Sequence, residues 1–157
     1  MKIITYGWSL KWKAPIIVKK EIDLKCEGEG CEDNPFVIKP SSMLPSYFEI
    51  HNSEYYVDIQ NCDLESIDLK HCRNVTFKDC KLKRSKLEGC SIIRYLNSNI
   101  YGNLTLLSCN EVKIEECIIN KLKFKSSNSN LVKNCSINTI KKIRSKNNIF
   151  EEIINSK

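Results

Sequence analysis

The amino-acid sequence predicts an all-β fold, a parallel β-helix or β-solenoid with rungs of about 18 residues. Three patterns with this step predict it, carried by small residues, by apolar residues and by charges. They run through residues 57–153, so we expect one structural domain. Within it, residues 1–45 are expected to form N-terminal strands and a cap, residues 46–146 the rungs, and residues 147–157 a C-terminal cap.

The small residues form two interleaved series. Successive members of each series are one repeat apart, and a single longer step, shared by both series, falls near Tyr101, Gly102 and Asn103. Thiols or hydroxyls at two fixed points per turn are typical of a β-solenoid. The first series is Cys62, Cys80, Ser98, Cys117 and Cys135, and the second is Cys72, Cys90, Cys109, Ser127 and Ser145.

Apolar residues follow the same step in columns. They lie two residues apart within short segments and three apart between segments, which is strand periodicity interrupted by corners. No helix has this spacing. The clearest columns are Val57, Val75, Ile93 and Val112, then Ile59, Phe77, Tyr95, Ile114 and Val132, and then Leu64, Leu82, Ile100, Ile119 and Ile137.

Charges of opposite sign also recur one rung apart. Asp63 stands one repeat before Lys81, and Glu65 stands one repeat before Lys83. Parallel stacking in register would place each pair on adjacent rungs, roughly 4.8 Å apart, where opposite charges attract. The charges therefore support the register, although each exposed pair contributes well under about 1 kcal/mol.

The two ends of the chain depart from the repeat. Trp8, Leu10 and Trp12 alternate on one strand face, which predicts a strand lid over the open end of the core. At the other end, Asn148 and Glu151 have capping-box spacing, which predicts a short C-terminal capping helix. A last strand is the alternative.

Two polar residues interrupt the apolar columns near the C-terminus. Asn130 and Lys142 occupy positions that hold Val and Leu in earlier rungs. Because a buried lone lysine is costly, we expect the final turns to be frayed or rearranged.

Of the nine cysteines, those of the two series are best explained as packed thiols. Sulfurs on adjacent rungs are too far apart for a disulfide, and free cysteine is among the most buried residue types. Zinc is the alternative, but the chain has no CxxC knuckle and only two histidines, His51 and His71. Cys26 and Cys31 lie outside the series and are the one pair that could bridge under oxidising conditions.

Composition and motifs narrow the possible functions. No apolar run is long enough to predict a membrane span, and the start of the chain lacks a secretory core, so we expect a cytoplasmic chain. Because no nucleophile motif, phosphate loop or paired-histidine site is present, we expect no catalytic residue, metal or cofactor. We expect the outward carboxylates to form solvated charge pairs between rungs rather than a Ca²⁺ site or a glycosidase site. These carboxylates are Asp58, Asp63, Glu65 and Asp79.

Residues 28–38, 47–53 and 56–62 resemble the entry segment of the right-handed parallel β-helix proteins, the NosD-like and pectate-lyase-like superfamily. In that superfamily a glycine-rich turn and an Asn-Pro-aromatic strand open the helix, and rungs end in pairs similar to Asn134-Cys135 and Asp79-Cys80. The resemblance covers residues 28–140 and implies right-handed winding. The superfamily includes lyases, glycosidases and binding modules. Unlike its enzymes, this chain has rungs of nearly minimal length, which favours a small, non-enzymatic member.

A basic run near the C-terminus is the main functional lead. The net charge is +6, and residues 118–150 contain no carboxylate. Lys141 stands one repeat after Lys123, so their ammonium groups are expected to stack on one face and to attract an acidic polymer. The alternative is a solubilising lysine face. The predicted binding residues are Lys121, Lys123, Lys125, Lys133, Lys141 and Arg144.

Three functional hypotheses follow from these patterns. The first is a non-catalytic scaffold or protein-interaction module that binds a protein partner, or itself, through a solenoid face or end. The second is a carbohydrate-binding or carbohydrate-cleaving β-helix. The third is binding of a polyanion, such as nucleic acid or acidic glycan, through the basic face.

Overall fold

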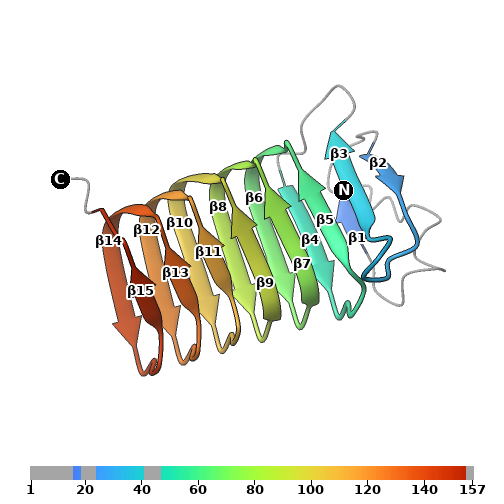
Figure 1. Cartoon of the computed structure of the whole chain (residues 1–157). Helices are drawn as coiled ribbons and strands as arrows, with labels where there is room; N and C mark the ends of the chain where they lie inside the picture. Colours follow the sequence, from blue (N-terminus) through green and yellow to red (C-terminus); the bar gives the residue numbers. More distant parts are fainter. Residues whose placement is uncertain (1–15, 19–23, 41–46, 155–157) are drawn as a thin grey trace.

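The structure, a computed structural model, describes residues 16–18, 24–40 and 47–154. Every regular element in these residues is a β-strand. The strands stack into an elongated coil whose turns lie side by side along one axis (Figure 1). The prediction of an all-β solenoid with rungs of about 18 residues is confirmed.

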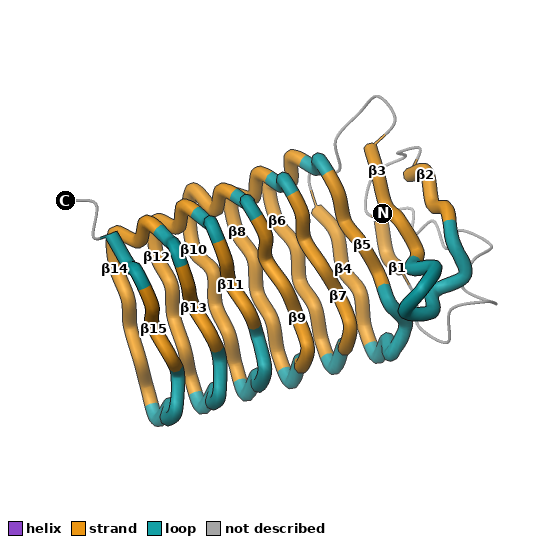
Figure 2. The backbone as a smooth tube through the Cα atoms, in the orientation of Figure 1, coloured by secondary structure: helices purple, strands orange, loops and turns teal. Residues whose placement is uncertain are grey.

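Two sheets form opposite walls of the coil, and the chain alternates between them (Figure 2). Sheet A consists of β1 (Ile16–Val18), β4 (Tyr47–His51), β6 (Asp63–Lys70), β8 (Lys81–Glu88), β10 (Asn99–Leu107), β12 (Ile118–Lys125) and β14 (Ser136–Ile143). Sheet B consists of β2 (Leu24–Glu27), β3 (Phe36–Pro40), β5 (Val57–Gln60), β7 (Arg73–Lys78), β9 (Ser91–Leu96), β11 (Lys113–Glu115), β13 (Leu131–Lys133) and β15 (Ile149–Glu151).

The N-terminal edge of each sheet ends in an antiparallel strand. β1 pairs antiparallel with β4, and β2 pairs antiparallel with β3, whereas the other neighbouring strands are parallel. The predicted lid strand with Trp8, Leu10 and Trp12 lies outside the described residues.

Neighbouring turns pair in the register that the repeat predicts. Asp63 is opposite Lys81, and Val57 is opposite Val75. The longer step in the two series corresponds to a β-bulge in β10, where the register shifts between Ile100 and Asn103. A side chain at Gly102 would collide with the carbonyl oxygen of Lys83, so glycine is needed where the extra residue is accommodated.

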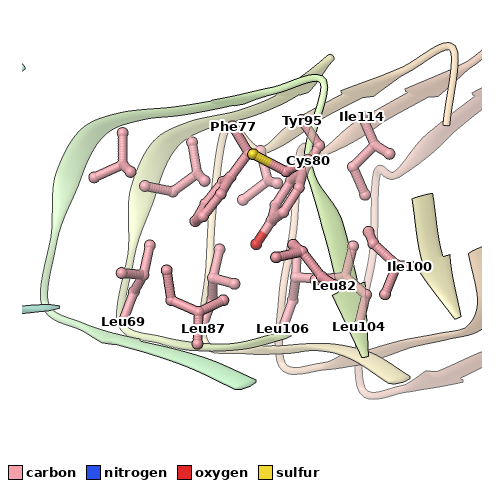
Figure 3. Packing of buried hydrophobic residues seen from close by; sticks show 14 of the residues in the cluster. Leu69, Phe77, Cys80, Leu82, Leu87, Tyr95, Ile100, Leu104, Leu106 and Ile114 are labelled. Atoms are coloured by element: carbon pink, nitrogen blue, oxygen red, sulfur yellow. The ribbon is translucent and has the colours of Figure 1, made fainter. Parts of the chain in front are cut away.

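Inward side chains form a continuous apolar core between the two sheets. The predicted columns are buried, and Phe77 and Leu87 have no exposed surface. Ser85 is a polar residue in the inward column of Ile67 and Leu104, and its Oγ lies 2.7 Å from the Tyr95 hydroxyl. The Tyr95 ring stacks on Phe77 of the preceding turn, with ring centroids 4.6 Å apart and planes inclined by 7° (Figure 3). The small Ser85 side chain therefore makes room for Tyr95 and satisfies its hydroxyl.

The corners of the coil explain the two series of small residues. Each member follows a residue with positive φ, most often Asn, Asp, Ser or Gly, which adopt this conformation at low cost. Ser98 Oγ accepts a hydrogen bond from the Cys80 N–H at 3.1 Å and donates one to the Leu96 carbonyl at 2.9 Å. Cys80 Sγ lies 3.2 Å from the Ile59 carbonyl oxygen and 3.3 Å from that of Lys78, and its one S–H is directed between these two acceptors. Cysteine and serine both occur in the series because either side chain can satisfy buried main-chain groups at a corner.

The thiols of the two series are buried and free. They are Cys62, Cys72, Cys80, Cys90, Cys109, Cys117 and Cys135. The pKa of Cys62 is raised by its interaction with the Cys80 side chain and by burial. The pKa of Cys72 is raised by its interaction with the Cys90 side chain and by burial. These two thiols are therefore protonated at neutral pH and act as packing groups. Cys31, outside the series, is exposed and free.

The C-terminal end differs from the prediction. The predicted capping helix is wrong, because residues 149–151 form strand β15, which pairs in parallel with β13. Ile154 then bridges Ser136, so the coil continues beyond residue 146. Asn148 does not cap a helix, because its Oδ1 accepts the main-chain N–H of Asn130 on the preceding turn at 3.1 Å.

The last described turns are ordered as rungs, contrary to the expected fraying. Asn130 is buried, but its Oδ1 accepts the Val112 N–H at 2.9 Å and its Nδ2 donates to Asn148 Oδ1 at 2.8 Å. Lys142 keeps the register opposite Phe124 and is exposed, because β14 is the last strand of sheet A. Its Nζ lies 3.8 Å from the centroid of the Phe150 ring, a cation–π contact.

Candidate interaction surfaces

Four of the predicted basic residues lie together on the outer face of sheet A. Lys121, Lys123 and Lys125 occupy alternate outward positions of β12, between the buried Leu122 and Phe124. Lys141 lies opposite Lys123 on the adjacent strand β14. We call Lys121, Lys123, Lys125 and Lys141 the lysine wall.

The other two predicted residues do not belong to this wall. Lys133 lies on β13 in sheet B, between Glu115 and Glu151, and its Nζ is 3.4 Å from Glu151 Oε2. Arg144 is exposed at the corner that follows β14. From β3 onward, consecutive strands of the chain belong to opposite sheets, which separates Lys133 from lysines that are close to it in sequence.

No carboxylate lies on the strands that carry the lysine wall or on the neighbouring strand β10. β10, β12 and β14 contain no Asp or Glu. In an earlier strand of sheet A, lysines form ion pairs. Lys83 Nζ lies 2.8 Å from Glu65 Oε2, and Lys86 Nζ lies 3.2 Å from Glu88 Oε2. Lys123 and Lys141 instead stand on adjacent strands, roughly 4.8 Å apart, where like charges repel.

Two large apolar side chains are exposed beside the lysine wall. Ile118, the first residue of β12, is 57% exposed, and Tyr101, in the bulge of β10, is 53% exposed. We did not predict either residue as part of a site. The sequence did carry a signal for Ile118, because the equivalent outward position in other turns is polar, as in Asp63, Lys81, Asn99 and Ser136.

A polar groove of about 300 Å³ lies on the outer face of sheet B. Its floor includes Asp58, Thr76 and Arg94, which are opposite one another on β5, β7 and β9. The turn before β3 contributes Glu32, whose Oε2 accepts a hydrogen bond from the Tyr56 hydroxyl at 3.2 Å. Desolvation and the Glu32 carboxylate raise the pKa of Tyr56, so its hydroxyl remains protonated. Carboxylates therefore lie toward one end of the groove, and the cations of Lys78 and Arg94 lie one and two turns from Asp58.

The shape of the turn beside the groove depends on glycine. Gly28 has φ of 100°, and a Cβ at this position would collide with the carbonyl oxygen of Pro35. We did not predict this groove, because the turn belongs to an antiparallel hairpin between β2 and β3 that is not part of the repeat.

A second cavity, of about 540 Å³, is lined by Asn52, Glu54, Tyr55 and His71. His71 is exposed at the corner between β6 and β7. Its ring lies beside Gly89, where a side chain would collide with the imidazole. The cavity thus offers one imidazole and one carboxylate, with no aliphatic hydroxyl or thiol nucleophile among its described lining residues.

Other features of the described residues constrain function only weakly. No group of three or more His, Cys, Asp or Glu side chains in residues 16–18, 24–40 and 47–154 is placed to hold a metal ion. The same part of the chain has no helix long and apolar enough to cross a membrane.

Comparisons with known proteins found no matching family model, no similar curated protein and no similar solved structure.

Proposed function

We propose that the protein is a non-catalytic interaction module that binds a protein partner through the lysine wall and the adjacent Ile118 and Tyr101. The observation that carries this proposal is the combination of four lysines without carboxylates on their strands and two exposed apolar side chains close to them on β10 and β12. A partner that covers this face would bury the apolar area and offset the repulsion between lysines.

The construction of sheet A suits this role. β12 is hydrogen-bonded to β10 on one side and to β14 on the other, so its outward side chains project from a fixed backbone. Beneath the lysines, Leu122 and Phe124 are fully buried and hold the strand against the core. A surface that is already ordered loses little conformational entropy on binding.

Photo-crosslinking tests the proposal. With benzoylphenylalanine in place of Ile118, we expect one discrete adduct with a partner protein in the cells that make this chain. The same crosslinker in place of Lys113, an exposed residue of β11 in sheet B, is the matched control and should not give that adduct. No adduct from the Ile118 position, or equal adducts from both positions, would remove the case for docking on sheet A.

Carbohydrate binding is a second candidate, favoured by the groove on sheet B. Its lining combines hydroxyl, carboxylate and guanidinium groups, which can hydrogen-bond sugar hydroxyls, with the aromatic ring of Tyr56. This candidate accords with the resemblance to the NosD-like and pectate-lyase-like superfamily, a relationship that we also propose.

A glycan array tests this second candidate. We expect any bound glycan to be lost when Asp58 and Arg94 are both replaced by alanine, because both contribute to the groove. Replacement of Asn138 and Thr139, exposed residues of β14 in sheet A, is the control and should leave binding unchanged. Assays for released reducing or unsaturated ends would distinguish binding from cleavage. An array without any bound glycan counts against the candidate.

A further inference from the structure

We infer that the lysine wall recognises an extended acidic protein segment with carboxylates at every second residue and an apolar residue ahead of them. The inference rests on the proposed function, since it names the chemistry of the partner at the same surface. It follows from the spacing of the lysines, from the exposed Ile118 and from the absence of acidic residues in β10, β12 and β14.

The spacing of the lysines matches an extended peptide. Lys121, Lys123 and Lys125 are two residues apart on one strand, so their Cα atoms are about 6.6 to 6.8 Å apart at the usual strand rise. An extended peptide lying along β12 has the same rise, so carboxylates at alternate residues would meet successive ammonium groups. Lys141, one strand away, would contact the same segment from the side.

The apolar side chains favour a protein segment over a nucleic acid. Ile118 precedes the three lysines on the same strand and is 57% exposed, and it offers contact for an aliphatic side chain but nothing to a phosphate. Binding of single-stranded nucleic acid uses a series of aromatic side chains on which bases stack. On β10, β12 and β14, the one exposed aromatic residue is Tyr101.

Titration of the ¹⁵N-labelled full chain with model peptides tests the inference. The peptide Leu-Ser-Glu-Ser-Glu-Ser-Glu places its leucine and its three glutamates on one side of an extended chain, with the glutamates at the spacing of Lys121, Lys123 and Lys125 and the leucine ahead of them, toward Ile118. A peptide of the same composition with the three glutamates consecutive, Leu-Ser-Ser-Ser-Glu-Glu-Glu, is its control. We expect amide shifts confined to β12 and the adjoining strands, tighter binding of the alternating peptide, and weaker binding as salt is added.

Two charge-reversal variants complete the design. Lys123→Glu with Lys141→Glu should weaken binding of the alternating peptide about tenfold, because two favourable charge contacts become repulsive. Lys39→Glu with Lys113→Glu makes the same change of charge at exposed positions of sheet B, outside the groove, and should leave binding unchanged. Equal binding of both peptides, or equal loss in both variants, would overturn the inference. Tighter binding of an oligothymidylate or of heparin, abolished by the lysine-wall variant alone, would overturn it in favour of a polyanion.

The two proposals can fail separately. If the adduct from benzoylphenylalanine at position 118 forms with the lysine wall intact and persists when Lys123→Glu and Lys141→Glu are added, docking stands and the acidic segment is excluded. If no such adduct forms with the lysine wall intact, the docking surface itself is excluded, whatever the model peptides do.

Discussion

Replacement of Phe77 by alanine is expected to lower the free energy of unfolding by about 3 to 5 kcal/mol. Phe77 has no exposed surface, and its ring stacks on Tyr95 in the middle of the coil (Figure 3). Its loss would leave a cavity between two turns and remove the support of Tyr95, whose hydroxyl lies 2.7 Å from Ser85 Oγ. Urea denaturation followed by circular dichroism measures the change.

The control for this experiment is Tyr101→Ala, which removes an aromatic ring of similar size from the outside of the coil. We expect it to change the free energy of unfolding by less than about 0.5 kcal/mol, as is usual for surface substitutions. If both substitutions cost the same, the Phe77 side chain does not lie in the packed core.

Replacement of Asn130 by alanine is expected to cost about 3 kcal/mol, because it leaves buried polar groups without partners. Asn130 Oδ1 accepts the Val112 N–H, and its Nδ2 donates to Asn148 Oδ1. Both contacts link adjacent turns near the C-terminal end of the coil. Hydrogen exchange should locate the loss at residues 112 and 130 and in the strands around them.

Asn120→Ala is the matched control, because Asn120 is exposed and its Oδ1 accepts a hydrogen bond from Asn138 Nδ2 at 3.1 Å, also on the surface. We expect a change of less than about 0.5 kcal/mol there. A stable Asn130→Ala variant with unchanged exchange at Val112 would contradict the buried ladder of Asn130 and Asn148.

The repeat made most of the fold predictable, because one error in register would have exposed an entire apolar column. The pairing of Asp63 with Lys81 and the ion pair between Glu65 and Lys83 both follow from the constant length of the repeat. Fraying of the final turns was predicted wrongly because Asn130 and Lys142 were compared with apolar residues of earlier turns. Asn130 satisfies its amide within the column, and Lys142 is exposed at the end of the stack.

The surfaces were less predictable than the core. The lysines of β12 and Lys141 could be placed on one face, because outward columns obey the same step as inward ones. Lys133 could not be separated from them without knowing which strands share a sheet. The groove depends on a hairpin turn that does not belong to the repeat, so no periodicity indicates where Glu32 lies relative to Tyr56.

Each parallel turn is hydrogen-bonded to the turns directly before and after it, so the number of turns can change during evolution while the remaining turns keep their contacts. Duplication or loss of one whole turn between Cys62 and Cys135 would preserve every corner, column and ladder on either side of the join. Gain or loss of a single residue would instead require a local irregularity of a strand, such as the β-bulge at Gly102. The length of the protein, and with it the area of its outer faces, is thus adjustable in whole units without a new core.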